Sequence, residues 1–251
     1  MVMLGSEQLP PLHFPVSHKV GEGTRHLRLR TLVYLFLKHA FEDIACIGSD
    51  QFVYWDPTNP KVCLAPDAFI RFGNKNEDFD CWKVWERGAP QVAVEIISDT
   101  DARESIWDDK LDRYRRLGVS ELVWFNYQTP ERPLRIWDFA GDELLERRLF
   151  EPWAQSRHLD GYWLPFEAEN GDLCLRLSRD PRGRQLFPTA EEQYARERSA
   201  EAEGRRAAER ALHEAETRQR EAETRQREAD ARQREAERRI AELEAELRRR
   251  S

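Results

Sequence analysis

Residues 82–98 read WKVWERGAPQVAVEIIS, and this stretch decides the fold that the sequence predicts. Its second part, residues 92–98 (VAVEIIS), is almost wholly apolar, which is typical of a strand that is buried on both faces of a sheet. Glu95 is the exception. A lone carboxylate on such a strand costs several kcal/mol unless it is ion-paired, protonated or bound to a metal ion. We therefore take Glu95 as the first candidate functional residue.

The patterns on both sides of this strand predict an α/β fold, with helices packed around one mixed sheet. Apolar residues at mixed three- and four-residue spacing indicate helices, and runs rich in β-branched and aromatic residues indicate strands. In chain order, we expect a helix over residues 24–40, strands over 44–55, 64–72 and 92–98, a helix over 102–117 that ends at Gly118, a buried strand over 121–126 and an exposed hairpin of 134–139 and 144–150.

A second carboxylate, Asp67, follows Pro66 inside the predicted strand 64–72. Two acids on neighbouring strands can chelate a hard cation such as Mg²⁺, and such an ion polarises a phosphate and lowers the pKa of a bound water. Lys110, on the following helix, would place a positive charge beside the charge that develops in a reaction. A structural alternative stays open, in which Pro66-Asp67 starts a turn and Glu95 and Lys110 form an ordinary ion pair.

The order of these motifs resembles a family of bacterial nucleases. The sequence contains Pro66-Asp67, then Glu95-Ile96-Ile97-Ser98, then Lys110 and Tyr114 in a K-x-x-x-Y pattern, then GVSELVWF at residues 118–125. Together with the approach WKVWERGAPQ, this order is similar to the Uma family, which is assigned to the restriction endonucleases within the PD-(D/E)XK nuclease superfamily. The resemblance covers about residues 28–191, and members of this type often carry a charged helical tail.

The resemblance implies a restriction-endonuclease-like core, in which helices flank a four-stranded mixed sheet, and hydrolysis of phosphodiester bonds in DNA with Mg²⁺ or Mn²⁺. It implies that Asp67, Glu95 and the backbone carbonyl of Ile96 bind the metal ion. The superfamily's usual E-x-K lysine would fall at Ile97, whereas the family pattern places a lysine on the next helix, which Lys110 matches. Lys110 would orient the attacking water or stabilise the pentacovalent charge, and Tyr114, one helical turn on, would hydrogen-bond into the site.

Other candidate residues carry less weight. Glu42, at the end of the first helix, is a further acid that such a nuclease could bring to the metal, although a solvated helix end is the more ordinary interpretation. The six histidines show no HExxH or paired ligand spacing, and we interpret each as ordinary. The four cysteines lie far apart with no CxxC pair, so we expect reduced thiols and no zinc site.

The composition changes near Pro188. Residues 214–234 read EAETRQR, EAETRQR, EADARQR, a seven-residue repeat that is rich in helix formers. Acidic residues precede basic residues by four positions throughout this repeat, which is the order that stabilises an isolated helix. We therefore predict a nuclease-like domain over residues 1–188 and a charged helical or coiled-coil tail over residues 189–251.

Two interpretations of the tail stay open. Glutamine and alanine alternate along one seam, and large aliphatic residues enter this seam only near its end, at Ile240, Leu243 and Leu247. The tail is then either a solvated single helix held by its own ion pairs or a loose coiled coil anchored at those three residues, which would make a homo-oligomer.

The overall charge and hydropathy limit the class of protein. The 40 Lys and Arg residues against 47 Asp and Glu residues give a formal net charge of −7, so no strongly basic nucleic-acid surface stands out. No apolar run approaches the roughly 18 residues of a membrane span, and the first residues do not read as a secretory signal. We expect a cytoplasmic enzyme with no membrane partner, or else an inactive nuclease-fold module that binds nucleic acid or assembles through its tail.

Overall fold

The computed structural model describes residues 23–97, 104–168 and 170–250. Ser98, which ends the predicted strand 92–98, and residues 102–103 of the predicted helix lie outside the described residues. The chain divides into two compact units, Met1–Glu192 and Gln193–Ser251.

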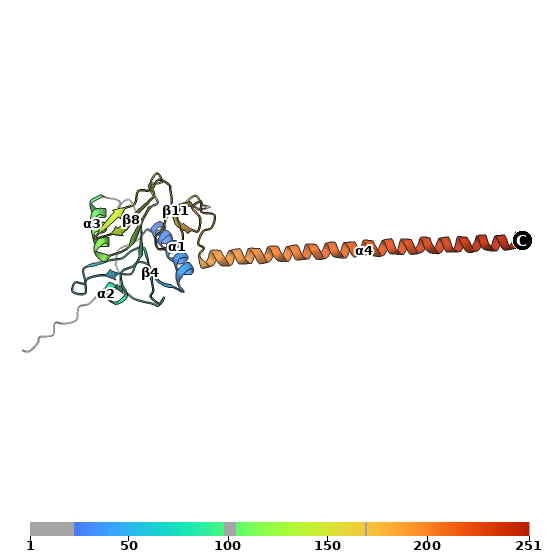
Figure 1. Cartoon of the computed structure of the whole chain (residues 1–251), viewed down its shortest axis with the longest axis horizontal. Helices are drawn as coiled ribbons and strands as arrows, with labels where there is room; N and C mark the ends of the chain where they lie inside the picture. The colour runs from blue at the N-terminus through green and yellow to red at the C-terminus, as the bar shows by residue number, and fades with distance from the viewer. Residues whose placement is uncertain (1–22, 98–103, 169, 251) are drawn as a thin grey trace, which may run out of the picture. The chain divides into compact units, whose positions relative to one another are not determined.

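A mixed six-stranded sheet forms the centre of the first unit (Figure 1). Its strands, in spatial order, are β1 (Ala45–Gly48), β4 (Ala68–Phe72), β6 (Val92–Ile97), β7 (Glu121–Asn126), β8 (Leu134–Ala140) and β9 (Glu143–Glu146). The pair β6 and β7 is parallel, and the other neighbours in this sheet are antiparallel. The predicted mixed sheet flanked by helices is confirmed, and it is wider than the four strands that the family resemblance implies.

Strands β6 and β7 lie at the middle of the sheet, and every residue of both is buried. Parallel neighbours need a crossover connection, and helix α3 (Glu104–Leu117) provides it. Gly118 ends α3 with a positive φ of 81° and donates its N–H to the carbonyl of Tyr114 at 3.1 Å. A left-handed residue at this position satisfies a helix-end carbonyl, which is the role that the sequence assigns to this glycine.

Helices α1 (Thr24–Phe41) and α3 cover opposite faces of the sheet (Figure 1). Val94 and Ile96 of β6 belong to the apolar cluster that contains the buried face of α1. Ala93 and Ile97 belong to the other cluster, which contains Tyr114 and Leu117 of α3. Because side chains alternate along a strand, Glu95 points toward α3 together with Ala93 and Ile97.

Two three-stranded sheets complete the first unit. One consists of β3 (Cys63–Leu64), β2 (Val53–Tyr54) and β5 (Trp82–Lys83), and the short helix α2 (Val84–Arg87) follows β5. The other consists of β10 (Ala154–Gln155), β11 (Tyr162–Glu167) and β12 (Leu173–Ser178).

Three predicted strand assignments are wrong in extent or exposure. The predicted strand 44–55 is divided into β1 and β2 near Asp50, whose φ of 63° is incompatible with a continuous strand. The predicted strand 64–72 is divided into β3 and β4 at Pro66-Asp67, because proline has no N–H for a strand ladder. The hairpin is exposed only on β9, since most residues of β8 are buried.

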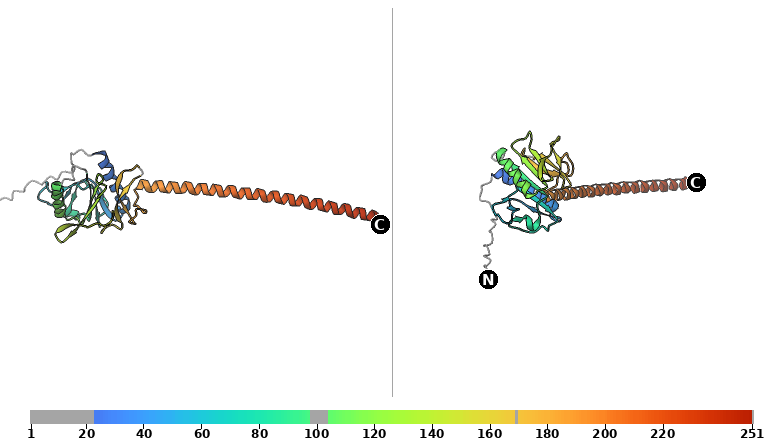
Figure 2. Two further views of the ribbon diagram at one scale, coloured as in Figure 1. Left: turned by 90° about the horizontal axis from the view of Figure 1, so that it is seen from above. Right: turned by 60° about the vertical axis from the view of Figure 1, so that its left-hand side comes forward.

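Helix α4 (Ala190–Arg250) runs without a break through the second unit, as the sequence predicts (Figure 2). It begins with a capping box: Glu192 donates its backbone N–H to Oγ1 of Thr189 at 3.2 Å, and Thr189 donates its N–H to Oε2 of Glu192 at 2.9 Å. Arg176 of β12 donates two further hydrogen bonds to the same carboxylate, at 2.7 and 2.8 Å. Glu192, the last residue of the first unit, therefore holds the first turn of α4 within that unit.

No helix within the described ranges has the length and apolar content that crossing a bilayer requires.

Candidate active site

Asp67, which directly precedes β4, lies level with Glu95 of the neighbouring strand β6. The antiparallel register pairs Ala68 of β4 with Val94 of β6, so the residue before Ala68 is opposite the residue after Val94. Both acids are buried, with 8% of Asp67 and 2% of Glu95 exposed. The negative charge of Asp67 also contributes to the pKa of Glu95, as expected of two close carboxylates. The structure thus brings together the two acids that the sequence singles out.

Two donors from one helix contact Glu95. Lys110 donates from Nζ to Oε2 of Glu95 at 2.6 Å, and the hydroxyl of Tyr114 donates to Oε1. Lys110 and Tyr114 are four residues apart on α3, so both side chains project from the same face of that helix. Lys110 thus reaches the glutamate of β6 from the helix that follows this strand.

Burial raises the pKa of the Glu95 carboxyl, and the neighbouring charge of Asp67 raises it further, against the opposing effect of the Lys110 ammonium. The pKa of the Tyr114 hydroxyl is raised well above 10.0, first by burial and then by the charge of Glu95. Tyr114 therefore keeps its proton at neutral pH and acts as a hydrogen-bond donor. Glu95 is a carboxylate whose proton affinity is increased, which is common among catalytic groups.

Asp67 is held by contacts from three parts of the chain. Its Oδ2 accepts the backbone N–H of Ile96 at 2.7 Å, and its Oδ1 lies 2.8 Å from Nε2 of His26, which acts as the donor. Ser49 donates from Oγ to the backbone carbonyl of Asp67 at 2.8 Å. This bond places the backbone N–H of Ile96, the residue whose carbonyl is the predicted third metal ligand, beside the Asp67 carboxylate.

His26 is the site residue that sequence reasoning missed. It lies 41 positions before Asp67, in the first turn of α1, and no ligand spacing marks it. Its role depends on how α1 packs against the end of the sheet, which is a tertiary relationship. His26 therefore has a specific hydrogen-bond partner that its sequence context does not indicate.

The donors at this site fit a hard divalent cation. Asp67, just before β4, and Glu95, on β6, offer carboxylate oxygens, and a cation between them would offset their mutual repulsion and burial. Among the described residues, no cluster of three or more His, Cys, Asp or Glu side chains could hold a metal ion. A site with two carboxylates is typical of Mg²⁺, which keeps several water ligands and is completed by substrate phosphates.

Glu42 occupies the opposite end of α1 from His26. It is exposed and forms the C-terminal cap of the helix, with its N–H donated to the carbonyl of Lys38. At 1.5 Å per residue, the 16 positions between His26 and Glu42 correspond to about 24 Å along the helix. This places Glu42 at a solvated helix end, far from the carboxylates.

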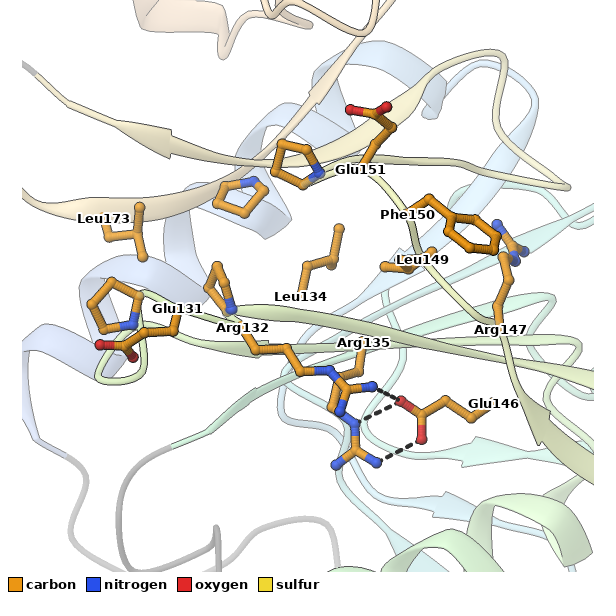
Figure 3. A pocket seen from close by; sticks show the side chains of 14 residues that line it. Glu131, Arg132, Leu134, Arg135, Glu146, Arg147, Leu149, Phe150, Glu151 and Leu173 are labelled. Carbon is orange, nitrogen blue, oxygen red and sulfur yellow. Dashed lines mark hydrogen bonds and ion pairs between the residues drawn. The ribbon is translucent and has the colours of Figure 1, made fainter.

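A separate pocket of about 460 Å³ lies beside the turn before β8, the β9–β10 connection and strands β11 and β12 (Figure 3). Its arginines are occupied: Arg135 donates to both oxygens of Glu146, at 2.9 and 2.7 Å, and Arg132 donates to the same carboxylate at 2.7 Å. None of the residues that line the pocket is among the predicted site residues.

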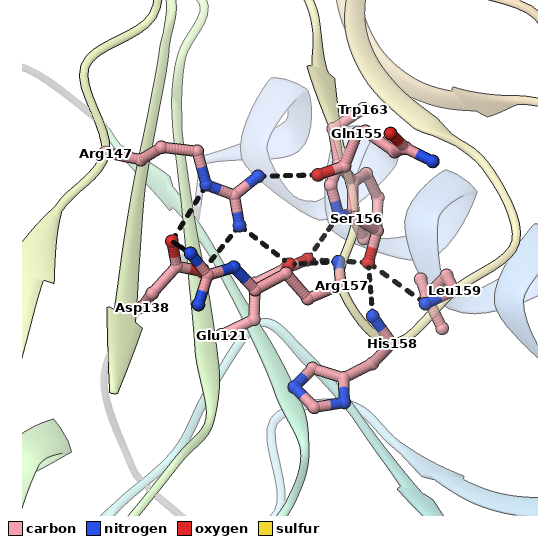
Figure 4. A network of polar contacts seen from close by, with 9 residues as sticks. All are labelled: Glu121, Asp138, Arg147, Gln155, Ser156, Arg157, His158, Leu159 and Trp163. Atoms are coloured by element: carbon pink, nitrogen blue, oxygen red, sulfur yellow. Dashed lines mark hydrogen bonds and ion pairs between the residues drawn. The ribbon is translucent and has the colours of Figure 1, made fainter. Parts of the chain in front are cut away.

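A second buried acid pair provides an instructive contrast (Figure 4). Glu121 and Asp138 are opposite each other on β7 and β8, and Arg147 lies between them and donates to both. Glu121 has no exposed surface, and it also accepts hydrogen bonds from Ser156 at 2.7 Å and from the indole of Trp163 at 3.0 Å. This pair has its own arginine and ties the central sheet to the β10–β12 sheet, so we assign it a structural role.

Comparisons with known proteins found a matching family model and a similar solved structure. A family model described as "Uma2: Putative restriction endonuclease" matches residues 17–165. A solved structure, described as a putative nuclease belonging to DUF820 from Anabaena variabilis ATCC 29413, is similar with a TM-score of 0.39 and 13% sequence identity. That match covers 53% of this chain and 71% of the other chain. No curated protein matches the sequence.

Proposed function

We propose that this chain, which belongs to the Uma2 family, is a nuclease that hydrolyses phosphodiester bonds in DNA with a divalent metal ion held by Asp67 and Glu95. The observation that carries this proposal is the placement of both carboxylates at one level of the sheet, with Lys110 of α3 against Glu95. Two acids and a lysine are also the set that the family resemblance implies for phosphodiester hydrolysis.

In the proposed reaction, a water molecule attacks phosphorus, the phosphorus–oxygen bond to the leaving sugar breaks, and negative charge increases on the phosphoryl oxygens. A Mg²⁺ or Mn²⁺ ion bound by Asp67, Glu95 and the carbonyl of Ile96 would act as a Lewis acid and lower the pKa of a bound water. The protein's own residues hold these ligands in place and supply charge.

Lys110 supplies a positive charge on the α3 side of Glu95. Its ammonium lies 2.6 Å from Oε2 of Glu95, close enough to donate to a phosphoryl oxygen or an attacking water beside that carboxylate. Tyr114, protonated at neutral pH, fixes the other oxygen of Glu95. The two side chains thereby keep the glutamate in one orientation.

The start of α1 supplies positive charge beside Asp67. Arg25, Arg28 and Arg30 flank His26 in the first two turns, and Arg28 is largely exposed. Arg25 and Arg28 both pair with Asp172, so that acid moderates their charge. We propose that this basic helix start contacts substrate phosphates, which accounts for nucleic-acid binding by a chain whose net charge is −7.

A nuclease-fold module without catalysis is the alternative, and one observation favours it. Each of the four carboxylate oxygens of Asp67 and Glu95 already accepts a hydrogen bond from the protein, and two of those donors are Lys110 and His26. A metal ion would have to share these oxygens or displace a donor. Such a module would bind nucleic acid or partners without cutting.

Metal titration and cleavage assays distinguish the two functions. Isothermal titration of the full chain with Mn²⁺ should show binding, and Glu95→Gln and Asp67→Asn should each weaken it, whereas Glu42→Gln should bind like the wild type. With Mg²⁺ present, the wild type and Glu42→Gln should cut plasmid DNA, and the two site variants should not.

Single-stranded DNA and RNA are tested in parallel, because cleavage of RNA alone would change the proposed substrate. Absence of Mn²⁺ binding at millimolar concentrations, or equal cleavage by all four proteins, would contradict the proposed active site.

A further inference from the structure

We propose that α4 pairs with α4 of a second copy of this chain as a parallel, two-stranded coiled coil. This inference is independent of the proposed hydrolysis, because it uses only residues of the tail. The relevant surface is a seam that repeats every seven residues along the helix. Its members are Leu212, Ala215, Gln219, Ala222, Gln226, Ala229, Gln233, Ala236, Ile240, Leu243 and Leu247.

The seam is uncharged in a segment where most other positions are charged. None of its 11 residues is Asp, Glu, Lys or Arg, whereas 19 of the other 25 residues between Leu212 and Leu247 are. A solvated single helix gains from charged pairs on every face and has no need of an uncharged stripe. A stripe that persists over five heptads is the pattern that a coiled-coil partner covers.

Large apolar side chains at both ends of this stripe are left in solvent by a single chain. Leu212 is 62% exposed and Ile240 is 57% exposed. The stretch between them contributes alanine and glutamine, which allow two helices to approach closely but bury little apolar surface. The exposed aliphatic residues therefore mark the positions at which pairing buries the most apolar area.

The charges beside the seam select a second copy as the partner. The row on one side, the e positions of the heptad, is wholly acidic: Glu216, Glu223, Asp230, Glu237 and Glu244. The row on the other side, the g positions, is basic over four successive heptads: Arg218, Arg225, Arg232 and Arg239. Each helix therefore carries both halves of a complementary charge pattern.

The same rows select the parallel orientation. In a parallel pair, each g residue faces the e residue five positions later on the partner, so that all four arginines, starting with Arg218 opposite Glu223, meet an acid. In an antiparallel pair, g faces g and e faces e, which brings arginine to arginine and acid to acid. The charge pattern therefore favours one orientation and opposes the other.

Contacts within the single helix are compatible with this pairing. Nη2 of Arg218 lies 3.2 Å from Oε2 of Glu214, and this arginine side chain is 78% exposed. The ion pair is therefore weak, and an ion pair with the partner helix can replace it. Seam glutamines donate to the e-row acids of their own helix, as from Gln219 to Glu223 at 3.0 Å and from Gln226 to Asp230 at 2.9 Å. Polar residues at such positions restrict a coiled coil to one register.

The test compares two triple reversals in the full chain by sedimentation equilibrium over a wide concentration range. Arg218→Glu, Arg225→Glu and Arg232→Glu change the g row, which faces the partner. Arg220→Glu, Arg227→Glu and Arg234→Glu change the same number of charges on the b row, which faces solvent. Each arginine in both sets follows an acid by four residues, so both variants lose equivalent pairs within their own helix, and circular dichroism checks that helicity matches.

The wild type should show a concentration-dependent equilibrium between monomer and dimer, and the solvent-facing reversal should keep the same dissociation constant. The g-row reversal should raise the dissociation constant on the order of 100-fold, because six interhelical ion pairs become repulsive. A monomeric wild type, a trimer or tetramer, or equal effects of the two reversals would overturn the proposal.

Orientation is tested with Leu212→Cys near one end of the seam. Mild oxidation should join two copies of this variant by a disulfide, with the wild type as the control for its four native cysteines. A parallel pair places both introduced thiols side by side, whereas an antiparallel pair separates them by roughly the length of the seam, about 50 Å. A dimer that fails to cross-link would overturn the parallel arrangement.

Discussion

The ammonium of Lys110 lies 2.6 Å from Oε2 of Glu95, although the lysine belongs to a helix and the glutamate to the central strand of the sheet. The resemblance to the wider nuclease superfamily implies a lysine two residues after the glutamate, and here Ile97 occupies that position. Because α3 packs on the face toward which Glu95 points, a lysine on α3 can occupy the same region of space. The charge is thus supplied by a different element.

Replacing Lys110 should separate catalysis from metal binding. We expect Lys110→Met to lower the cleavage rate by about 100-fold, the size of effect typical for loss of one charge-stabilising group. Mn²⁺ affinity should be unchanged or higher, because a competing cation has left Glu95. Arg116→Met, a control on the same helix with an exposed and ion-paired arginine, should behave like the wild type. Parallel loss of metal affinity and cleavage in Lys110→Met would show that the lysine only maintains the structure.

Removing the histidine beside Asp67 should weaken metal binding. We expect His26→Ala to reduce Mn²⁺ affinity by about 10–100-fold, because groups that orient a ligand typically contribute this much. His39→Ala, an exposed histidine at the other end of the same helix, is the matched control and should bind Mn²⁺ normally. Calorimetric titration of both variants is the measurement, and equal affinities would exclude a positioning role for His26.

Tyr114 should matter for stability because its hydroxyl donates to a buried carboxylate. Tyr114→Phe leaves Oε1 of Glu95 without that donor, and an unsatisfied buried charged acceptor costs about 1–3 kcal/mol. Urea unfolding should therefore show a lower free energy of unfolding for Tyr114→Phe. Tyr194→Phe removes an exposed hydroxyl and should have no measurable effect. An unchanged Tyr114→Phe midpoint would argue against this hydrogen bond.

The raised pKa of Glu95 makes stability depend on pH in a defined direction. Below the ordinary value of 4.5, the carboxyl is protonated in the folded and unfolded states alike, and ionisation costs nothing. As the pH rises through the higher pKa of the folded state, burial and the charge of Asp67 oppose ionisation, so this group's contribution to stability is lost.

We therefore expect metal-free Glu95→Gln to melt at a higher temperature than the wild type at pH 7.5, with the difference closing below pH 4.5. Addition of Mn²⁺ should raise the melting temperature of the wild type but not of the variant. Glu42→Gln serves as the control and should follow the wild type at every pH. A constant difference between wild type and Glu95→Gln across the pH range would contradict the raised pKa.

The buried network around Glu121 should affect folding rather than chemistry. Glu121→Ala leaves the Ser156 hydroxyl and the Trp163 indole without their acceptor and removes one of the two acids that Arg147 contacts. Breaking a buried ion pair in this way costs about 3–5 kcal/mol. The melting temperature should fall sharply, while the fraction that remains folded should bind Mn²⁺ with normal affinity. Glu143→Ala, on the exposed strand β9, is the comparison.

Local patterns were sufficient to predict the elements that surround Glu95. The apolar run of β6 and the periodicity of α1 and α3 come from neighbouring residues, and the observed bounds lie close to the predicted ones. The predicted pair of acids is also adjacent in the structure, since consecutive sheet strands commonly pair. What those acids do, and whether a metal ion joins them, stays a prediction.

Contacts between residues far apart in the chain, and breaks within strands, could not be predicted from the sequence in the same way. His26 contacts Asp67, which lies 41 residues later in the chain, because helix α1 packs beside the start of β4. The sequence carries no periodic signal of that contact. The division of the predicted strand 44–55 depends on the positive φ of Asp50, which aspartate tolerates but does not demand. The β10–β12 sheet was not predicted either, because short strands such as β10 give too few residues to show alternation.

Because few large side chains lie along the seam of α4, the activity of the proposed nuclease would depend on protein concentration. Two copies whose seam is largely alanine and glutamine bury little apolar surface and would separate and rejoin readily. The paired fraction would therefore be small in dilute protein and would grow steeply as the protein concentration rises. Cutting both strands of a duplex in one encounter takes two catalytic centres, and pairing would bring two copies of the proposed active site into one molecule. Double-strand breakage would then rise roughly as the square of protein abundance, whereas single nicks would rise only in proportion to it.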